Sequence, residues 1–370
     1  SRAAKGNDVL IYNITLPADQ HMGGTHWYHT HYHMKSFEYI GGGAFGPLIV
    51  DDNGHDVGTK DAGVLSFLKK DRLVVLDNRS GDWRANGLKK ADTYTFRKDE
   101  WYRLRMLTVS LDGHHSTHMV NFDKHCEVRA IAHDGIFRLQ VPAEHKDTYA
   151  LTVASRLDVA IYCYAESTIR VDFTEVVKIA VADSPDADLV STPFEAGNQT
   201  WSSKRPAYLE DLRPLKVDNQ RTAKIDTTNI NGISCSENRP LCSTHGTDFK
   251  YGSVQEWTLR QVNTHSFHVH TYPMQIASSG CGTGHDVGEF YDTVFAVNAK
   301  SSERCLVRLR MVDVAGPVLM HCHNLKHAAH GSMGYIMVDG GPTQPSEPRV
   351  QECTSGPVCD KPHARKRCGM

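Results

Sequence analysis

Three features are missing from this chain of 370 residues, and each absence excludes a class of protein. No run of 18 apolar residues occurs, so the sequence predicts no membrane-spanning helix. Basic residues are not in excess, since 41 Lys and Arg stand against 43 Asp and Glu for a formal net charge of −2. This balance excludes the electrostatic footprint of a nucleic-acid-binding protein. Long stretches with a 3.6-residue apolar period are also missing, which argues against a helical fold.

The apolar segments that do occur are short and are typical of β-strands. Residues 73–76, 102–107, 157–162 and 305–310 alternate or run apolar. Gly, Asp, Asn and Pro separate such segments at short intervals, as they do in sandwiches. The sequence therefore predicts an all-β protein.

Histidine is abundant, with 22 residues, and it recurs in pairs that have one residue between the two imidazoles. The pairs are His29 and His31, His268 and His270, and His321 and His323. Because side chains alternate along a strand, both imidazoles of a pair would lie on one face, about 7 Å apart. A single pair is common on surface strands without any metal. Three pairs spread along the chain predict metal sites.

The third pair encloses a thiol, because Cys322 lies between His321 and His323, and His327 follows. On a strand, Cys322 points away from its two neighbours, so the tripeptide can serve two metal sites at once. A thiolate with two imidazoles and a weak axial group is the ligand set of a blue copper centre. The backbone around Cys322 would then be a short covalent path for electrons between the sites, which predicts a redox enzyme.

These segments resemble copper-binding segments of the multicopper oxidases, a family that includes laccases and metallo-oxidases. The similar segments are residues 24–31 with 46–50, residues 265–270 with Ser266 in place of the usual Pro, and residues 321–333. Weaker likeness lies between them, at residues 131–135, 156–159 and 291–294. The resemblance covers roughly residues 20 to 340 and implies tandem cupredoxin-like Greek-key β-sandwich domains.

The resemblance also implies a role for each ligand. His265, Cys322 and His327 would hold a type 1 copper that takes electrons from the substrate. A trinuclear copper cluster that reduces O₂ to water would be held by His29, His31, His268, His270, His321 and His323. Cys322, His321 and His323 would form the electron path between the two copper sites. The complete protein would bind about four copper ions, and its partners would be O₂ and a reductant. A phenol or an aromatic amine is favoured as the reductant over a metal ion.

The chain departs from the family pattern in three ways. The family's cluster uses eight imidazoles and six are found here, which predicts that the sequence lacks the front half of a first domain. The axial position, ten residues after Cys322, holds Ser332 with Met333 beside it. A weak or missing axial ligand predicts a raised type 1 potential. Ala328 and Ala329 stand where relatives often carry an acidic residue thought to deliver protons.

The expected organisation is a first-domain remnant at 1–52, a middle domain at 53–185, a linker at 186–204, a copper-binding last domain at 205–342 and a tail at 343–370. Glycosylation sequons at Asn13, Asn78 and Asn198 favour a secreted glycoprotein in the extracellular space or the secretory pathway. Ten cysteines occur, and Cys235 and Cys242 are close enough in sequence to pair, but spacing leaves the disulfide connectivity open.

Two other functions stay open at this point. A two-domain copper nitrite reductase also uses cupredoxin sandwiches, but that family has no His on both sides of the Cys. A non-enzymatic cupredoxin relative would have kept the fold and lost its metals, whereas the segment 321–323 is intact here. We interpret four other histidines as structural or surface residues. They are the dense cluster His114, His115 and His118, and His33 beside the first pair.

Overall fold

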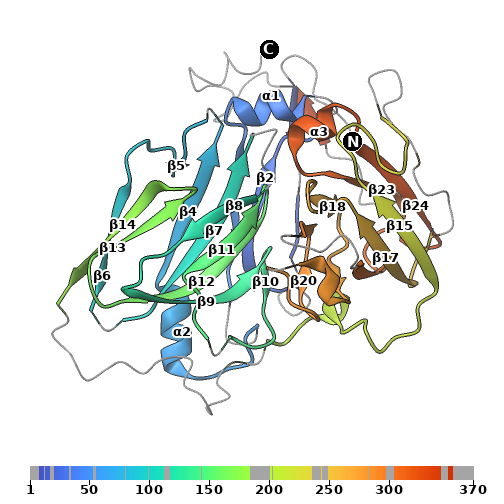
Figure 1. The fold of residues 1–370 in the computed structure, drawn as a ribbon. Coiled ribbons are helices and arrows are strands. Elements are labelled where there is room, and N and C mark those ends of the chain that lie inside the picture. Colours follow the sequence, from blue (N-terminus) through green and yellow to red (C-terminus); the bar gives the residue numbers. More distant parts are fainter. Residues whose placement is uncertain are drawn as a thin grey trace.

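Two β-sandwiches lie side by side in the computed structural model of this protein, with a short β-ribbon between them (Figure 1). The structure describes residues 8–11, 13–16, 21–32, 35–52, 56–79, 81–98, 100–111, 117–142, 144–183, 201, 203–235, 243, 249–282, 284–296, 304–342 and 349–352. The linker predicted at 186–204 and the tail predicted at 343–370 lie mostly outside these residues.

The middle sandwich contains the strands between residues 71 and 182. One sheet has the order β10-β9-β12-β7-β4-β5, and the other has the order β11-β8-β13-β14-β6. The strands are β4 (Asp71–Asn78), β5 (Arg84–Ala85), β6 (Asp92–Arg97), β7 (Tyr102–Ser110), β8 (Thr117–Asn121), β9 (Cys126–His133), β10 (Ile136–Phe137), β11 (Thr148–Thr152), β12 (Arg156–Cys163), β13 (Ser167–Val171) and β14 (Thr174–Ala182).

The last sandwich contains the strands between residues 219 and 339. Its two sheets have the orders β15-β17-β22-β19-β20 and β16-β24-β23-β18-β21. The strands are β15 (Asn219–Lys224), β16 (Phe249–Lys250), β17 (Val254–Arg260), β18 (Phe267–Val269), β19 (Met274–Ile276), β20 (Phe290–Tyr291), β21 (Thr293–Val294), β22 (Cys305–Arg310), β23 (Gly316–Cys322) and β24 (Met333–Asp339). The 3-10 helix η2 (Ser279–Cys281) and the α-helix α3 (Leu325–Ala329) lie between strands of this sandwich, and the 3-10 helix η1 (Ala207–Leu209) precedes its first strand.

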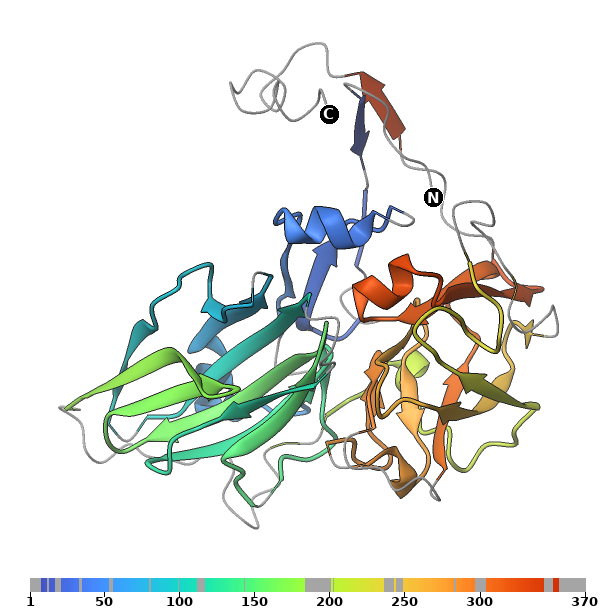
Figure 2. The same cartoon turned by 45° about the horizontal axis from the view of Figure 1, so that its top comes forward.

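The N-terminal part of the chain forms two small antiparallel pairs of strands. β2 (Gly24–His29) pairs with β3 (Phe45–Val50), and α1 (Ser36–Gly41) connects them. β1 (Asp8–Ile11) pairs with β25 (Arg349–Glu352), and this second pair of strands stands away from the body of the molecule (Figure 2). Helix α2 (Ala62–Lys69) precedes the middle sandwich, and its N-cap Asp61 accepts a hydrogen bond from the main-chain N–H of Val64.

Alternating burial explains why these segments pair into sandwiches. β22, with the sequence CLVRLR, alternates strictly between buried and half-buried residues, so its apolar face packs on the opposite sheet. Each sandwich has its own apolar core, and a third cluster that includes Met22, Phe137 and Phe290 joins the two sandwiches. Because Met22 lies just before β2, these packed side chains set the position of the β2–β3 pair, called the N-terminal ribbon below, relative to both sandwiches.

The all-β prediction is confirmed, and each of the four segments proposed as strands coincides with one, namely β4, β7, β12 and β22. The short helix α2 was not anticipated, since eight residues give too little periodicity to read. Disulfides join Cys126 to Cys163 and Cys281 to Cys305, pairs that lie far apart in sequence. Cys242, the suggested partner of Cys235, lies outside the described residues.

Candidate metal centres

The first group of potential ligands surrounds Cys322 at the end of β23. Cys322 is fully buried, and the antiparallel pairing of β23 with β18 places it opposite Phe267. The chain then turns at Asn324, whose side chain caps the N-terminus of α3, and this helix carries His327 back towards the thiol. The Nδ1 atoms of His265 and His327 lie 3.8 and 3.6 Å from Sγ of Cys322, and 3.1 Å from each other.

The thiol of Cys322 needs a cation in order to ionise in this place. Among the described residues it is the free cysteine, and burial raises its pKa to about 12. Burial also lowers the pKa of His265, so that its imidazole is neutral near pH 7. A soft metal ion among these three ligand atoms would displace the thiol proton and gain one thiolate and two imidazole ligands.

The second group consists of imidazoles on the other face of β23. Its members are His29, His31, His268, His270, His321 and His323. His268 lies on β18 directly opposite His321. The Nε2 atom of His321 lies 3.2 Å from Nε2 of His31 and 3.2 Å from Nε2 of His270. The ring of His29, at the end of β2, has its centroid 5.6 Å from that of His323. The structure thus brings together all six paired histidines from the ribbon and the last sandwich.

Main-chain carbonyls orient three of these imidazoles through their Nδ1 atoms. His29 Nδ1 lies 2.9 Å from the oxygen of Thr30, His268 Nδ1 lies 2.6 Å from that of Asp292, and His321 Nδ1 lies 3.0 Å from that of Cys322. Because a carbonyl only accepts, these contacts assign the proton to Nδ1 and leave the lone pair on Nε2. This is the arrangement by which a metal-ligating histidine is held through its other nitrogen.

Burial favours the neutral form of five imidazoles in the second group. Burial, together with the neighbouring histidines, holds the pKa values of His270, His321 and His323 well below the usual 6.5. The pKa values of His29 and His268 are lowered as well, again chiefly by burial. Neutral imidazoles with converging lone pairs are the form that binds a metal ion.

The donor sets fit copper. The buried Nδ1 of His323 has no hydrogen-bond partner among the described residues, which is costly unless another species occupies the site. Imidazole suits copper, zinc, iron and nickel, whereas a thiolate with two imidazoles and no carboxylate favours copper among them. The residues of both groups match the ligands predicted from the sequence, and their binding of copper stays a prediction.

The axial position predicted from the sequence holds Ser332, with Met333 beside it. Ser332 is fully buried, its hydroxyl donates to the carbonyl of Asn229 at 3.5 Å, and its own carbonyl accepts from the main-chain N–H of Cys322. Met333 packs against Cys235 and Ala328 at the start of β24. Of the other histidines, His118 bonds to Asp172 through Nδ1, while His33, His114 and His115 lie outside the described residues.

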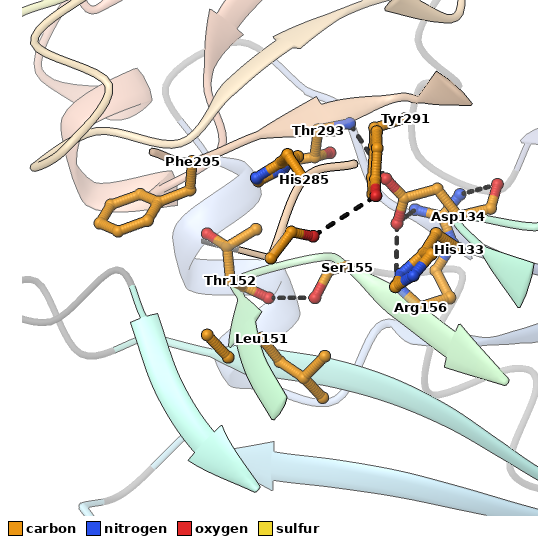
Figure 3. A pocket seen from close by; sticks show the side chains of 12 residues that line it. His133, Asp134, Leu151, Thr152, Ser155, Arg156, His285, Tyr291, Thr293 and Phe295 are labelled. Atoms are coloured by element: carbon orange, nitrogen blue, oxygen red, sulfur yellow. Dashed lines mark hydrogen bonds and ion pairs between the residues drawn. The ribbon is translucent and has the colours of Figure 1, made fainter. Parts of the chain in front are cut away.

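Sequence reasoning missed a polar junction where the two sandwiches meet. Arg156 of the middle sandwich binds the carboxylate of Asp292, and Asp134 accepts from the main-chain N–H groups of Asp292 and Thr293. Beside this junction lies a cavity of about 30 Å³, whose lining includes His285 and Arg156 (Figure 3). A cavity of this size holds about one water molecule, so it is not a site for an organic substrate. The residues of the polar junction lie in the segments 131–135, 156–159 and 291–294, to which the sequence alone assigned no role.

No helix among the described residues is long and apolar enough to cross a membrane.

Two of three comparisons with known proteins found similar proteins. Residues 212–342 match the sequence model described as multicopper oxidase. A laccase from Pediococcus acidilactici superposes with a TM-score of 0.63 at 17% identity, covering 86% of this chain and 70% of that one. A second similar structure is a laccase-like multicopper oxidase from Ochrobactrum sp., with oxidase activity towards lignin model compounds and lignosulfonate. It superposes with a TM-score of 0.62 at 16% identity, covering 86% of this chain and 77% of that one. A multicopper oxidase from Campylobacter jejuni, described as a metallo-oxidase, superposes with a TM-score of 0.61 at 16% identity, covering 88% of this chain and 73% of that one. No curated protein sequence matches. At these identities the structural likeness shows the fold.

Proposed function

We propose that this chain, whose residues 212–342 match the multicopper oxidase family, couples oxidation of a reducing substrate to reduction of O₂ to water. The observation that carries the proposal is the position of Cys322. Its thiol lies in the first ligand group, while its two neighbours in sequence, His321 and His323, lie in the second. Electrons entering at one group would reach the other through a few covalent bonds.

The proposed ligand sets follow from this geometry. His265, Cys322 and His327 would hold a type 1 copper. The six remaining imidazoles, those of His29, His31, His268, His270, His321 and His323, would hold a trinuclear cluster. Bound copper supplies one-electron redox chemistry, and reduction of one O₂ to two waters takes four electrons and four protons. The chain would supply the thiolate, the imidazoles and the carbonyl contacts that fix the Nε2 lone pairs of His29, His268 and His321.

The substrate would meet the protein beside the first ligand group. His265 and His327 are 6% and 9% exposed, whereas Cys322 is fully buried, so the two imidazoles are the more accessible ligands of this group. One-electron transfer to such a site needs access and a suitable potential, and no shaped organic pocket is required. We favour a phenol or an aromatic amine over a metal ion, because the sequence has no Met-rich segment of the kind that binds Cu(I).

We also propose that the protein works in an oxidising compartment, outside the cytosol. The disulfides Cys126–Cys163 and Cys281–Cys305 support this, since such bonds persist in secreted proteins. Of the three sequons, Asn13 is exposed and Asn78 is buried, so Asn13 is the better candidate for a glycan. Asn198 lies outside the described residues. Mass spectrometry of the protein from its natural source would find a glycan on Asn13 and none on Asn78.

The function is tested by loading the 370-residue protein with copper and counting copper per chain, together with electron paramagnetic resonance and O₂ consumption on a phenol. Cys322→Ser removes the thiolate, so the blue absorption and the oxidase activity should both disappear. His118→Gln is a matched control, because His118 is a buried histidine on β8 of the middle sandwich that bonds to Asp172 and belongs to neither ligand group. A protein that binds no copper, or a Cys322→Ser variant that keeps full activity, would overturn the proposal.

A further inference from the structure

Arg156 uses every donor of its guanidinium group inside the protein. Its side chain is 3% exposed. Nε donates to the main-chain oxygen of Thr25 at 3.2 Å. Nη1 donates to the oxygen of Ala154 at 2.8 Å and to Oδ1 of Asp292 at 3.1 Å, and Nη2 donates to the oxygen of Asp134 at 3.0 Å and to Oδ2 of Asp292. Five N–H groups thus meet five acceptors, which is the full capacity of an arginine.

The acceptors belong to three parts of the chain that are far apart in sequence. Thr25 lies on β2 of the N-terminal ribbon, Ala154 and Asp134 belong to the middle sandwich, and Asp292 belongs to the last sandwich. Figure 3 shows Arg156 beside Asp134 of the middle sandwich, and the carboxylate of Asp134 accepts from the main-chain N–H of Thr293 of the last sandwich. One side chain of the middle sandwich therefore ties the ribbon to the last sandwich.

Two of these three parts hold imidazoles of the second ligand group. The strand that contains Thr25 ends at His29, and His31 follows it. Asp292 binds both Nη atoms with its carboxylate. Its main-chain oxygen lies 2.6 Å from Nδ1 of His268 and accepts a hydrogen bond from it. The guanidinium thus lies between the segment that carries His29 and His31 and the segment that orients His268.

We propose that Arg156 is a positioning residue for the six-imidazole site, and that it fixes the distance between the ligands on the ribbon and those on the last sandwich. The middle sandwich, which contributes no ligand to either group, would thereby control the geometry of the site. This inference rests on the proposed function. Lysine cannot replace this residue, because its ammonium group has three donors on a flexible stem and lacks the planar fork that binds a carboxylate in a bidentate manner.

The test compares the full chain with Arg156→Lys and with Arg205→Lys as a matched control. The side chain of Arg205 is 6% exposed and also donates to a carboxylate, that of Glu289, whereas no hydrogen bond or ion pair among the described residues joins it to Thr25 or Asp292. Each protein is titrated with copper while the blue band of the Cys322 site and the resonance signals of the remaining copper are recorded. Loss of an interaction that orients a metal ligand typically weakens binding about 10- to 100-fold.

The expected result is that Arg156→Lys keeps the blue band and weakens copper binding at the six imidazoles by about that factor, while Arg205→Lys changes neither. Equal binding in the two variants would overturn the inference. Should Arg156→Lys fail to fold, Asp292→Asn keeps the main-chain carbonyl that orients His268 and removes the charge that pairs with Arg156. Its side-chain oxygen can still accept from the hydroxyl of Thr293. Asp292→Asn should also weaken copper binding at the six imidazoles, and an unchanged copper titration would again overturn the inference.

Crystal structures of the metal-free proteins make the test independent of copper loading. The separation between Nε2 of His31 and Nε2 of His321, 3.2 Å in the parent structure, should grow in Arg156→Lys and stay the same in Arg205→Lys. An unchanged separation in Arg156→Lys would refute the positioning role. A parent protein that takes up no copper would instead refute the proposed function, and the crystallographic comparison would still decide the role of Arg156.

Discussion

Metal binding at Cys322 should depend on pH over an unusually wide range. The perturbation is a change of pH on the metal-free protein, and the relevant quantity is the pKa of the thiol, which burial raises to about 12. At pH 8 a thiol with this pKa is ionised in about one molecule in ten thousand, compared with roughly one in four for an ordinary cysteine. Each metal ion that binds the thiolate must therefore displace one proton, and higher pH favours the bound state.

The magnitude follows from that single proton. Burial lowers the pKa of His265, so this imidazole stays neutral in the alkaline range, whereas the thiol keeps a proton that the metal ion must displace. The apparent dissociation constant for metal should fall about tenfold for each unit rise in pH, with no levelling until the pH approaches 12. An exposed cysteine would level off near its own pKa of about 8.5.

The assay uses Co²⁺, which gives a thiolate charge-transfer band and does not oxidise the thiol, in a chelator buffer between about pH 7 and 10. Cys322→Ser provides the control, since it removes the titrating group and should abolish the band. Alkylation gives an independent measure, because the metal-free thiol at pH 8 should react about a thousandfold slower than an ordinary one from ionisation alone. A binding curve that becomes flat near pH 9, or alkylation at the ordinary rate, would refute this reasoning.

Three further outcomes are expected from the same structure. Ser332→Met should lower the reduction potential of the blue site, because a thioether at the axial position would stabilise the oxidised metal; redox titration checks this, and a raised potential would contradict it. In the metal-free protein, the unfolding free energy should fall as the pH drops below 6.5, because burial lowers the pKa of His26 to about 4 and that of His133 to about 3. The unfolded chain binds these protons first, and each group contributes about 1.4 kcal/mol per pH unit within its window; equal urea midpoints at pH 7 and pH 5 would argue against this. Gly24→Ala should cost about 1–3 kcal/mol, because a Cβ there would meet the main-chain oxygen of Gly135 at 2.2 Å; an unchanged Tm would show that the close approach is relaxed in solution.

Local pattern was sufficient for the strands and for the types of ligand. The alternation of CLVRLR predicted β22, and the alternation around Cys322 predicted that its thiol and the imidazoles of His321 and His323 face opposite ways. These inferences succeed because the direction of a side chain on a strand is a property of two or three adjacent residues. The axial position is different, since spacing identified Ser332 while its hydrogen bond to Asn229 depends on a loop a hundred residues away.

The sequence by itself determined that this protein is all-β, that nine residues carry imidazoles or a thiol in metal-binding patterns, and that one tripeptide belongs to both groups. Tertiary structure alone decided that His31 and His321, 290 residues apart, bring their Nε2 atoms to 3.2 Å. It also decided that Arg156 joins the ribbon to both sandwiches. The physical reason is that alternation is set by local backbone geometry, whereas the meeting of distant segments depends on how whole sheets and their cores pack.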